Sequence, residues 1–200
     1  MQQDRAVSVI LVEHSYIRRL RGYISTSGDR VNLGLRGVEV HCEGVGGARL
    51  GSRQTTRRLL QAVSVHRPFA VFVHIGESNL GHMPDGQITA ELMDFIDRLS
   101  RLCLSRIVIV GQLISFPRTR REHRNTVRSI NDNLRWAIPS RQVFWRHQCG
   151  LTSDSSVSDL FLADGVHLRN EGMPRYFRSI RTVVGRVLCH NHPTYRRFQS

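Results

Sequence analysis

Short apolar runs alternate with amphipathic stretches along the whole chain. The runs are rich in β-branched and aromatic residues, as β-strands are, and they read "VSVILV" (7–12), "GVEVHC" (37–42), "FAVFVHI" (69–75), "RIVIVGQLI" (106–114) and "QVFW" (142–145). The stretches between them repeat apolar residues at the three- and four-residue spacing of a helix, over residues 52–65, 87–104, 120–137 and 171–189. A further helix is expected to begin at Ser15, soon after the first run. The pattern predicts five strand–helix units.

This order of elements favours one fold class. Several of the predicted strands are apolar almost throughout, as in a parallel sheet that helices cover on both faces. Five strand–helix units in succession predict an α/β protein, a three-layer α/β/α sandwich around a five-stranded parallel sheet. No repeat, low-complexity segment or linker interrupts the chain, so we expect one domain over residues 1–191 and a loose C-terminal tail over residues 192–200.

The N-terminal apolar run does not have the form of a targeting signal. It covers only residues 7–12 and is broken at once by Glu13 and His14, which is too short for a secretory signal peptide. No stretch approaches the roughly 18 apolar residues of a membrane span. We therefore expect a soluble, intracellular protein of the cytoplasm. The four cysteines are widely spaced and form no CxxC pair, so we expect reduced thiols and not disulfides. The short segment "CHNH" (189–192) has no distant partner pair, and we predict neither a metal site nor a cofactor.

The charge balance is unusual because all 29 basic residues are arginine and the formal net charge is +13. Arginine makes bidentate contacts with phosphate and carboxylate groups, and an excess of positive charge favours polyanions such as nucleic acid. The arginines are nevertheless spread along the chain and form no single dense run. Two interpretations stay open: a surface that contacts nucleic acid, and an ordinary solvated surface.

Side chains with chemical capability collect after the predicted strands, where ligands bind in parallel α/β sheets. They are Ser15 after the first strand, a glycine cluster at 44–47 after the second, Ser78 and Asn79 after the third, and Asp164 and His167 after the fifth. A hydroxyl, close-approach backbone amides, a polar donor and an Asp–His pair are the parts of a serine acyl-transfer site. His74, within the third run, is expected to be a satisfied core or near-site residue rather than a ligand.

Taken together, these stretches resemble the SGNH (GDSL-type) hydrolase family of esterases and lipases, over nearly the whole chain. The segment "DGVHLRNEGMPRYF" (164–177) is similar to the family's last block, an Asp-x-x-His before the final helix, and is the most specific match. The segment "ILVEHSYIRRL" keeps the serine of the first block as Ser15, and "GVGGA" supplies the second-block glycine as Gly47. The segment "GESN" aligns with the third block, Gly-x-Asn-Asp.

The resemblance implies a flavodoxin-like strand order, 2-1-3-4-5, and a two-step ester hydrolysis without a metal. It implies that Ser15 attacks the acyl carbonyl, that His167 carries the proton and that Asp164 fixes the imidazole tautomer. The backbone N–H groups of Ser15 and Gly47 would face the developing oxyanion, the first at a helix N-terminus where negative charge is favoured. The implied partner is a small-molecule ester.

Two positions depart from the family pattern. Ser78 stands at the position of the oxyanion asparagine with a shorter side chain, and a one-residue shift would give that role to Asn79 instead. Loss of one oxyanion donor costs about 2.7–4 kcal/mol. Glu13 stands where the first block usually has glycine, and its carboxylate opposes oxyanion formation if it points inward. Both substitutions act in the direction of slower catalysis.

Two hypotheses follow from these residues. The first is a serine esterase or acyl-hydrolase that acts on an ester with a small to medium acyl group. The second is a catalytically degraded SGNH-fold binding module that contacts nucleic acid through its arginine-rich surface. The "HSYIRRL" segment (14–20) also resembles domains encoded in some animal retroelements, where an esterase-like domain accompanies nucleic-acid-handling proteins.

Overall fold

The structure is a computed structural model, and it describes residues 6–13, 15–116, 119–147, 151, 159–193 and 195. The strands are β1 (Val7–Glu13), β2 (Val38–Gly44), β3 (Ala70–His74), β4 (Ile107–Gly111) and β5 (Val143–Trp145). The α-helices are α1 (Ser15–Ser25), α2 (Arg53–His66), α3 (Asp85–Leu102), α4 (Arg121–Ala137) and α5 (Met173–Asn191). Two 3₁₀ helices, η1 (Gly28–Gly34) and η2 (Glu77–Asn79), precede β2 and follow β3.

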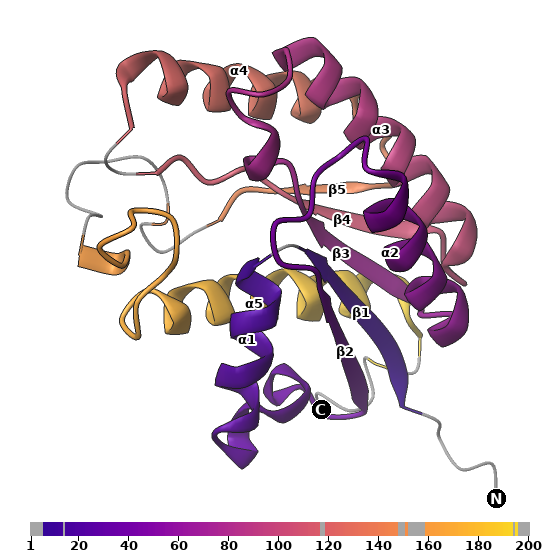
Figure 1. Ribbon diagram of the computed structural model, residues 1–200. Coiled ribbons are helices and arrows are strands. Elements are labelled where there is room, and N and C mark those ends of the chain that lie inside the picture. Colours follow the sequence, from indigo (N-terminus) through magenta and orange to yellow (C-terminus); the bar gives the residue numbers. More distant parts are fainter. Residues whose placement is uncertain are drawn as a thin grey trace, which may run out of the picture.

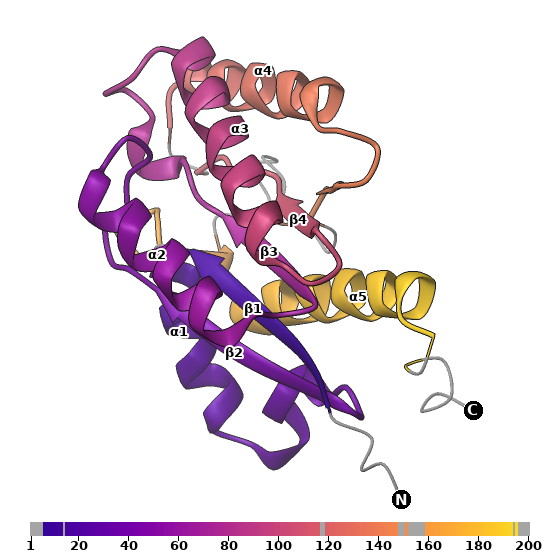
Figure 2. The same cartoon turned by 90° about the vertical axis from the view of Figure 1, so that its right-hand side faces the viewer.

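The five strands form one parallel sheet with the order β2-β1-β3-β4-β5, which confirms the predicted fold class and strand order. Helices α1 and α5 cover one face of the sheet, and α2, α3 and α4 cover the other (Figure 1). The turned view of Figure 2 likewise places α3 and α4 on the opposite side of the strands from α5. The molecule is therefore a three-layer α/β/α sandwich.

Each face of the sheet has its own hydrophobic core, and β1 contributes to both. Successive side chains of a strand point to opposite faces. Leu11 accordingly packs in the core under α1 and α5, and Val12 packs in the core under α2, α3 and α4. Both side chains are fully buried. An apolar strand with two covered faces explains why the first run has no polar alternation.

Strands β1, β2 and β3 end side by side. In the register of the sheet, Glu13 lies opposite Gly44 of β2 on one side and opposite His74 of β3 on the other. The loops that follow these three strands therefore start at neighbouring points on one end of the sheet. Those loops carry Ser15, the glycine cluster and Ser78, so the topology brings the candidate residues together.

The beginning of the predicted C-terminal tail is packed against the domain. The ring of His192 contacts Phe69, with the centroids 4.7 Å apart, and Tyr195 is fully buried in the core under α1 and α5. The other predicted tail residues, apart from Pro193, lie outside the described residues. The division into a domain over 1–191 and a tail over 192–200 stays a prediction.

Candidate active site

Asp164 and His167 lie in a tight turn before α5. The turn is closed by a hydrogen bond from the Leu162 N–H to the His167 carbonyl, 2.7 Å long, and by an antiparallel bridge between Phe161 and Leu168. This local pairing fixes the backbone on both sides of the turn. It brings the carboxylate within reach of the imidazole three residues later.

The carboxylate of Asp164 accepts three hydrogen bonds within this turn. Its Oδ1 accepts from the backbone N–H groups of Val166 and His167, at 2.9 Å each, and its Oδ2 lies 2.8 Å from His167 Nδ1. These donors, the His167 backbone N–H first among them, lower the pKa of Asp164 to about 2. An ionised Oδ2 requires a hydrogen on Nδ1. The turn therefore fixes the imidazole tautomer and leaves Nε2 as the basic nitrogen.

Tyr16 joins this turn to the start of α1. Its hydroxyl donates a 2.6 Å hydrogen bond to the Val166 carbonyl across 150 positions of sequence. Ser15 is the first residue of α1 and is 9% exposed. The residue that follows the candidate nucleophile thus anchors the turn that carries the candidate base. Figure 1 shows this turn, in orange, beside the start of α1.

One pocket of about 390 Å³ gathers candidate residues from several loops. Its lining consists of Ser15, Gly47, Ser78 and His167, the apolar Leu80, Phe116 and Val166, and the polar or charged Arg49, Glu77 and His82. Asp164 is connected to the pocket through His167 and does not line it. The hydroxyl, the glycine loop and the imidazole named from the sequence therefore open onto one space.

Asn79 does not line this pocket but supports one of its walls. Its Oδ1 accepts a hydrogen bond from the Leu50 N–H at 2.9 Å, and its Nδ2 donates to the Leu50 carbonyl at 3.1 Å. The residue is 2% exposed, so its amide is occupied by this backbone pairing. Of the two residues considered for the oxyanion, Ser78 faces the pocket, whereas Asn79 fastens the loop that carries Gly47.

Gly44, the last residue of β2, and Gly47, in the loop after it, are glycines for different structural reasons. A Cβ at Gly44 would lie 2.7 Å from the backbone nitrogen of Arg18, so glycine lets α1 pass this close to the end of β2. Gly47 has a φ of +66° with open space around it, and this left-handed conformation favours glycine. The first glycine therefore permits close packing, and the second shapes the loop at the pocket.

A buried polar chain leads from the pocket wall to α5. Glu77 is 5% exposed and accepts a hydrogen bond from the Ile114 N–H at 3.1 Å. Its Oε1 lies 2.6 Å from Nε2 of the fully buried His74, and His74 Nδ1 lies 2.7 Å from the Tyr176 hydroxyl. His74 is thus a near-site core residue. Sequence reasoning missed Glu77 and Tyr176 as its partners, because the only local signal was a histidine on an apolar strand.

His147 packs against this chain from the segment after β5. Its ring lies 4.9 Å from that of His74 and 5.2 Å from that of Tyr176, and its Nδ1 is 3.1 Å from the Ser179 hydroxyl. Burial lowers the pKa of His147 well below its usual value; nearby His74 lowers it further and Glu77 raises it. His147 is therefore a neutral packing and hydrogen-bonding group behind the pocket.

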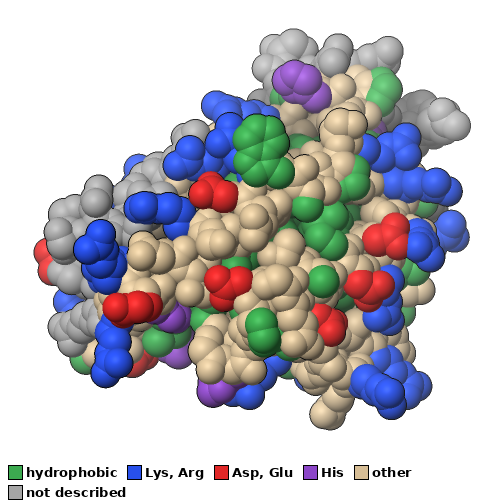
Figure 3. Space-filling model, turned by 90° about the horizontal axis from the view of Figure 1, so that it is seen from above, with side chains coloured by type: hydrophobic (Ala, Val, Ile, Leu, Met, Phe, Trp, Pro, Cys, Tyr) green, Lys and Arg blue, Asp and Glu red, His purple; other side chains and the backbone are tan. Residues whose placement is uncertain are grey.

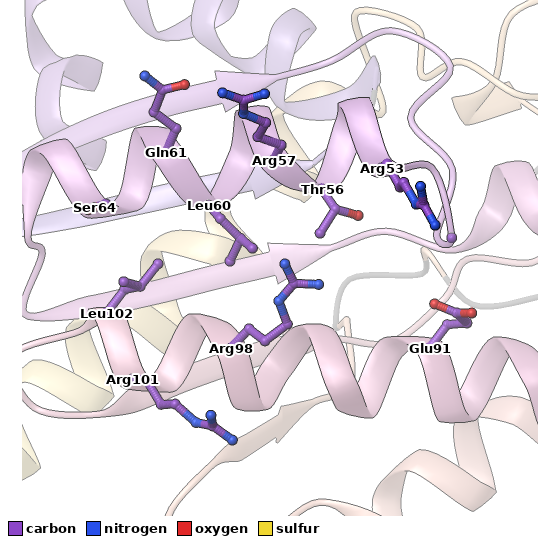
Figure 4. Close-up of a pocket in the computed structure, with 11 residues that line it drawn as sticks. Arg53, Thr56, Arg57, Leu60, Gln61, Ser64, Glu91, Arg98, Arg101 and Leu102 are labelled. Carbon is purple, nitrogen blue, oxygen red and sulfur yellow. The ribbon is translucent and has the colours of Figure 1, made fainter.

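A larger hollow, the groove, has a volume of about 1010 Å³ and lies between α2 and α3 (Figure 4). Its lining includes four arginines and two leucines: Arg53, Arg57, Arg98, Arg101, Leu60 and Leu102. In Figure 4, Leu60 and Arg98 point into the space between the helices, whereas Arg57 and Arg101 point away from it. Arg98 and Arg101 each form an ion pair with an aspartate four residues earlier. No residue of the predicted site lines this groove.

Within the ranges that the structure describes, no three or more His, Cys, Asp and Glu side chains are grouped so that they could hold a metal ion. In the same ranges, no helix has the length and apolar character needed to cross a membrane. The side chain of Glu13 lies outside the described residues, so its direction stays a prediction.

No protein-family model and no curated protein matches the sequence. Solved structures are similar at low identity. A carbohydrate esterase of family 3 from Talaromyces cellulolyticus is 16% identical with a TM-score of 0.66, and the match covers 91% of this chain and 98% of that one. A member of the lipolytic G-D-S-L family from Veillonella parvula is 15% identical with a TM-score of 0.67, covering 89% and 98%. A catalytic mutant of an acetylxylan esterase from Geobacillus stearothermophilus is 15% identical with a TM-score of 0.65, covering 92% and 97%. The chain therefore has the fold of the SGNH (GDSL-type) esterases and lipolytic acylhydrolases.

Proposed function

We propose that the protein is a serine esterase that cleaves a carboxylic ester with a small to medium acyl group. One observation carries this proposal: Ser15 and His167 line the same pocket, and Asp164 holds the His167 tautomer through a 2.8 Å contact. The fold shared with the esterases above supports the same class of reaction. The partner that the proposal implies is a small-molecule ester.

The reaction proceeds in two steps through an acyl-enzyme. Ser15 Oγ attacks the acyl carbonyl while His167 Nε2 takes the hydroxyl proton, and the same proton passes to the alcohol as its bond to the acyl carbon breaks. Water then attacks the acyl-enzyme and gives a proton to His167 Nε2. The acid leaves, and the proton returns to Ser15. Asp164 stabilises the imidazolium of both steps and stays ionised.

The oxyanion is stabilised by the backbone N–H groups of Ser15 and Gly47, with Ser78 as the side-chain donor. Ser15 begins α1, where the helix dipole favours negative charge. Ser78 lines the pocket and carries an O–H donor. Its side chain is shorter than the asparagine of the family pattern, so this donor is the weakest part of the site, and we expect slow turnover.

Covalent labelling with a fluorophosphonate probe, read by mass spectrometry, tests the proposal. We expect stoichiometric label on Ser15 of the wild type and none in Ser15→Ala or His167→Ala, because a serine without its base is a poor nucleophile. Ser129→Ala is the matched control, since Ser129 is exposed on α4, and it should label like the wild type. A folded wild type that takes no label, or a Ser15→Ala protein that still does, contradicts the proposal.

The second candidate is a catalytically degraded binding module that contacts nucleic acid through its arginines. The groove between α2 and α3 favours it, since four arginines line that hollow. The face seen in Figure 3, however, shows basic side chains spread among acidic ones. The comparisons support no association with retroelements, so this candidate rests on charge alone. A salt-dependent gel shift, together with no label on Ser15, would favour it.

A further inference from the structure

The pocket carries a positive charge at its mouth that ester hydrolysis itself does not use. Arg49 lines the pocket together with Gly47 and Ser78, and it is exposed. Among the residues that the structure describes, Arg49 takes part in none of the ion pairs. A cation at the rim of a pocket, with no ion-pair partner among the described residues, is available to a ligand.

The backbone on both sides of Arg49 is fixed in place. Ala48 is 1% exposed and Leu50 is 5% exposed, and both pack in the core under α2, α3 and α4. The Asn79 side chain binds the N–H and the carbonyl of Leu50. Arg49 therefore extends outward from a position held by two buried neighbours. Because the backbone is already held, binding of a ligand by the guanidinium requires no further ordering of this loop.

The acidic group in the pocket lining does not neutralise this charge. Glu77 is buried, its Oε1 lies 2.6 Å from His74 Nε2, and the same oxygen accepts the hydrogen bond from the Ile114 N–H. Its carboxylate is thus engaged inside the molecule, away from the mouth. His82, exposed and lining the same pocket, adds a further N–H donor there.

The pocket lining offers two kinds of surface to a bound ester. Leu80, which is 8% exposed, Phe116 and Val166 are its apolar members and suit the acyl group. Arg49 is exposed and remains for the alcohol part. We infer that Arg49 selects esters whose alcohol part carries an anionic group, a carboxylate or a phosphate, which the forked guanidinium binds with two N–H groups. This inference rests on the proposed esterase function.

The test compares acetate esters that differ in one charge. The substrates are 4-acetoxybenzoate, its neutral counterpart 4-acetoxybenzamide, and 4-acetoxyphenyl phosphate, with release of the phenol as the readout. For the wild type we expect kcat/KM to be about tenfold higher for the benzoate than for the benzamide. In Arg49→Gln this ratio should fall close to one, while Arg49→Lys should keep part of it because the charge remains without the fork.

Arg36→Gln is the matched control for a general effect of charge. Arg36 is exposed and precedes β2, at the opposite end of that strand from Arg49, and its loss should leave the ratio unchanged. An equal kcat/KM for benzoate and benzamide in the wild type overturns the inference, as does the same fall in Arg36→Gln and Arg49→Gln. A higher value for the phosphate than for the benzoate, with both above the benzamide, supports the inference and assigns a tetrahedral anion; the reverse order supports it and assigns a carboxylate.

Failure of the inference and failure of the esterase proposal have different signatures. Fluorophosphonate label on Ser15 without any charge preference among the three esters overturns the role of Arg49 alone. No label and no turnover of any ester overturns the proposed function and the inference with it.

Discussion

Two hollows of this molecule, the pocket at the strand ends and the groove between α2 and α3, differ in place as well as in size. The pocket at the strand ends measures about 390 Å³ and is lined by loops that follow different strands, whereas the groove measures about 1010 Å³ and is lined chiefly by α2 and α3. Volume would select the groove. In an open parallel sheet, however, ligands bind beyond the carboxyl ends of the strands. None of the predicted site residues lines the groove, so the convergence of loops, and not volume, supports the pocket as the proposed site.

The charges of the two hollows are also arranged differently. At the pocket, Asp164 contacts His167, and Glu77 contacts the fully buried His74. In the groove, the arginines are exposed, and two of them pair with aspartates on their own helix. A partner that fixes the geometry of a reacting group, as Asp164 does for His167, acts strongly on a reaction, whereas exposed charges without such a role are screened by water and salt. Substitutions at the pocket should therefore have large effects, and substitutions in the groove small ones.

The largest expected effect is that of Asp164→Asn. Asparagine keeps an oxygen for the backbone N–H groups but no longer requires the hydrogen on His167 Nδ1, so the base presents the wrong tautomer. We expect kcat for an aryl acetate to fall by roughly 10⁴-fold. Glu171→Gln, an exposed carboxylate a few residues further on, should keep wild-type turnover. Equal activity of Asp164→Asn and wild type would contradict the proposal that the reaction takes place in this pocket.

A gain of activity is expected from Ser78→Asn. The longer amide restores the side-chain donor of the family pattern at a position that lines the pocket, and one such donor is worth about 10²–10³ in kcat. Steady-state hydrolysis of 4-nitrophenyl acetate measures the gain. Ser64→Asn, on the exposed side of α2, should change nothing. If Ser78→Asn lowers kcat instead, the oxyanion is held by other groups and Ser78 only shapes the wall.

Substitutions in the pocket wall and in the groove should also differ in their effect on the free energy of unfolding. Asn79→Ala removes both partners of the buried Leu50 backbone groups, and unsatisfied buried groups of this kind cost about 2 kcal/mol of unfolding free energy. Thr56→Ala in the groove should change the unfolding free energy by less than about 0.5 kcal/mol, since its half-buried side chain lines the open groove and not the core. Urea unfolding measures both. Similar losses in the two variants would mean that the wall under Arg49 is not held by Asn79.

The contribution of the groove to polyanion binding can be separated from that of the other arginines. The comparison uses two triple substitutions to glutamine with the same loss of charge, one in the groove at Arg53, Arg57 and Arg98, and one on other elements at Arg36, Arg128 and Arg141. We expect both variants to lose affinity for a single-stranded oligonucleotide equally, by about fivefold, because dispersed charges release counterions in a similar way. Fluorescence anisotropy at several salt concentrations measures this. A much larger loss in the groove variant would make the groove a binding site.

Much of the fold could be predicted from the hydrophobic pattern. The strands β3 and β4 are buried throughout, so they stand out as apolar runs. The strand order came from the family resemblance, because periodicity does not encode which strands are neighbours. The helix η1 was not predicted. It is short, it carries no amphipathic repeat, and its interior includes Asn32 and Leu33 with positive φ values.

At the site, a contact between residues close in sequence could be predicted, whereas a contact between distant segments could not. The Asp164–His167 pair could be predicted because the two side chains are three residues apart and bond within one turn. The hydrogen bond from Tyr16 to Val166 spans 150 positions, and nothing in the sequence of either segment predicts it. Arg49 was missed for another reason. One arginine among 29 becomes distinctive only when the structure places it at the mouth of the pocket between two buried neighbours.

The smallest expected effect is the pH dependence of stability that Asp164 contributes. Its pKa falls from the ordinary 3.8 to about 2 in the folded protein, so the unfolded chain binds this proton more readily than the folded one. The contribution of the carboxylate to stability is therefore present above the unfolded pKa and is lost as the pH falls through the window between these two values. It is small because the side chain is 45% exposed and solvent screens the interaction.

Urea unfolding of wild type and Asp164→Asn at about pH 5 and about pH 2 measures this contribution. Asparagine retains an oxygen for the backbone N–H groups of the turn, so the difference between the two proteins isolates the charge. We expect the wild type to be the more stable at the higher pH and the two proteins to converge at the lower one. A difference that is equal at both pH values would mean that Asp164 acts in the folded turn as a neutral acceptor. Its hold on the His167 tautomer would then come from geometry and not from charge.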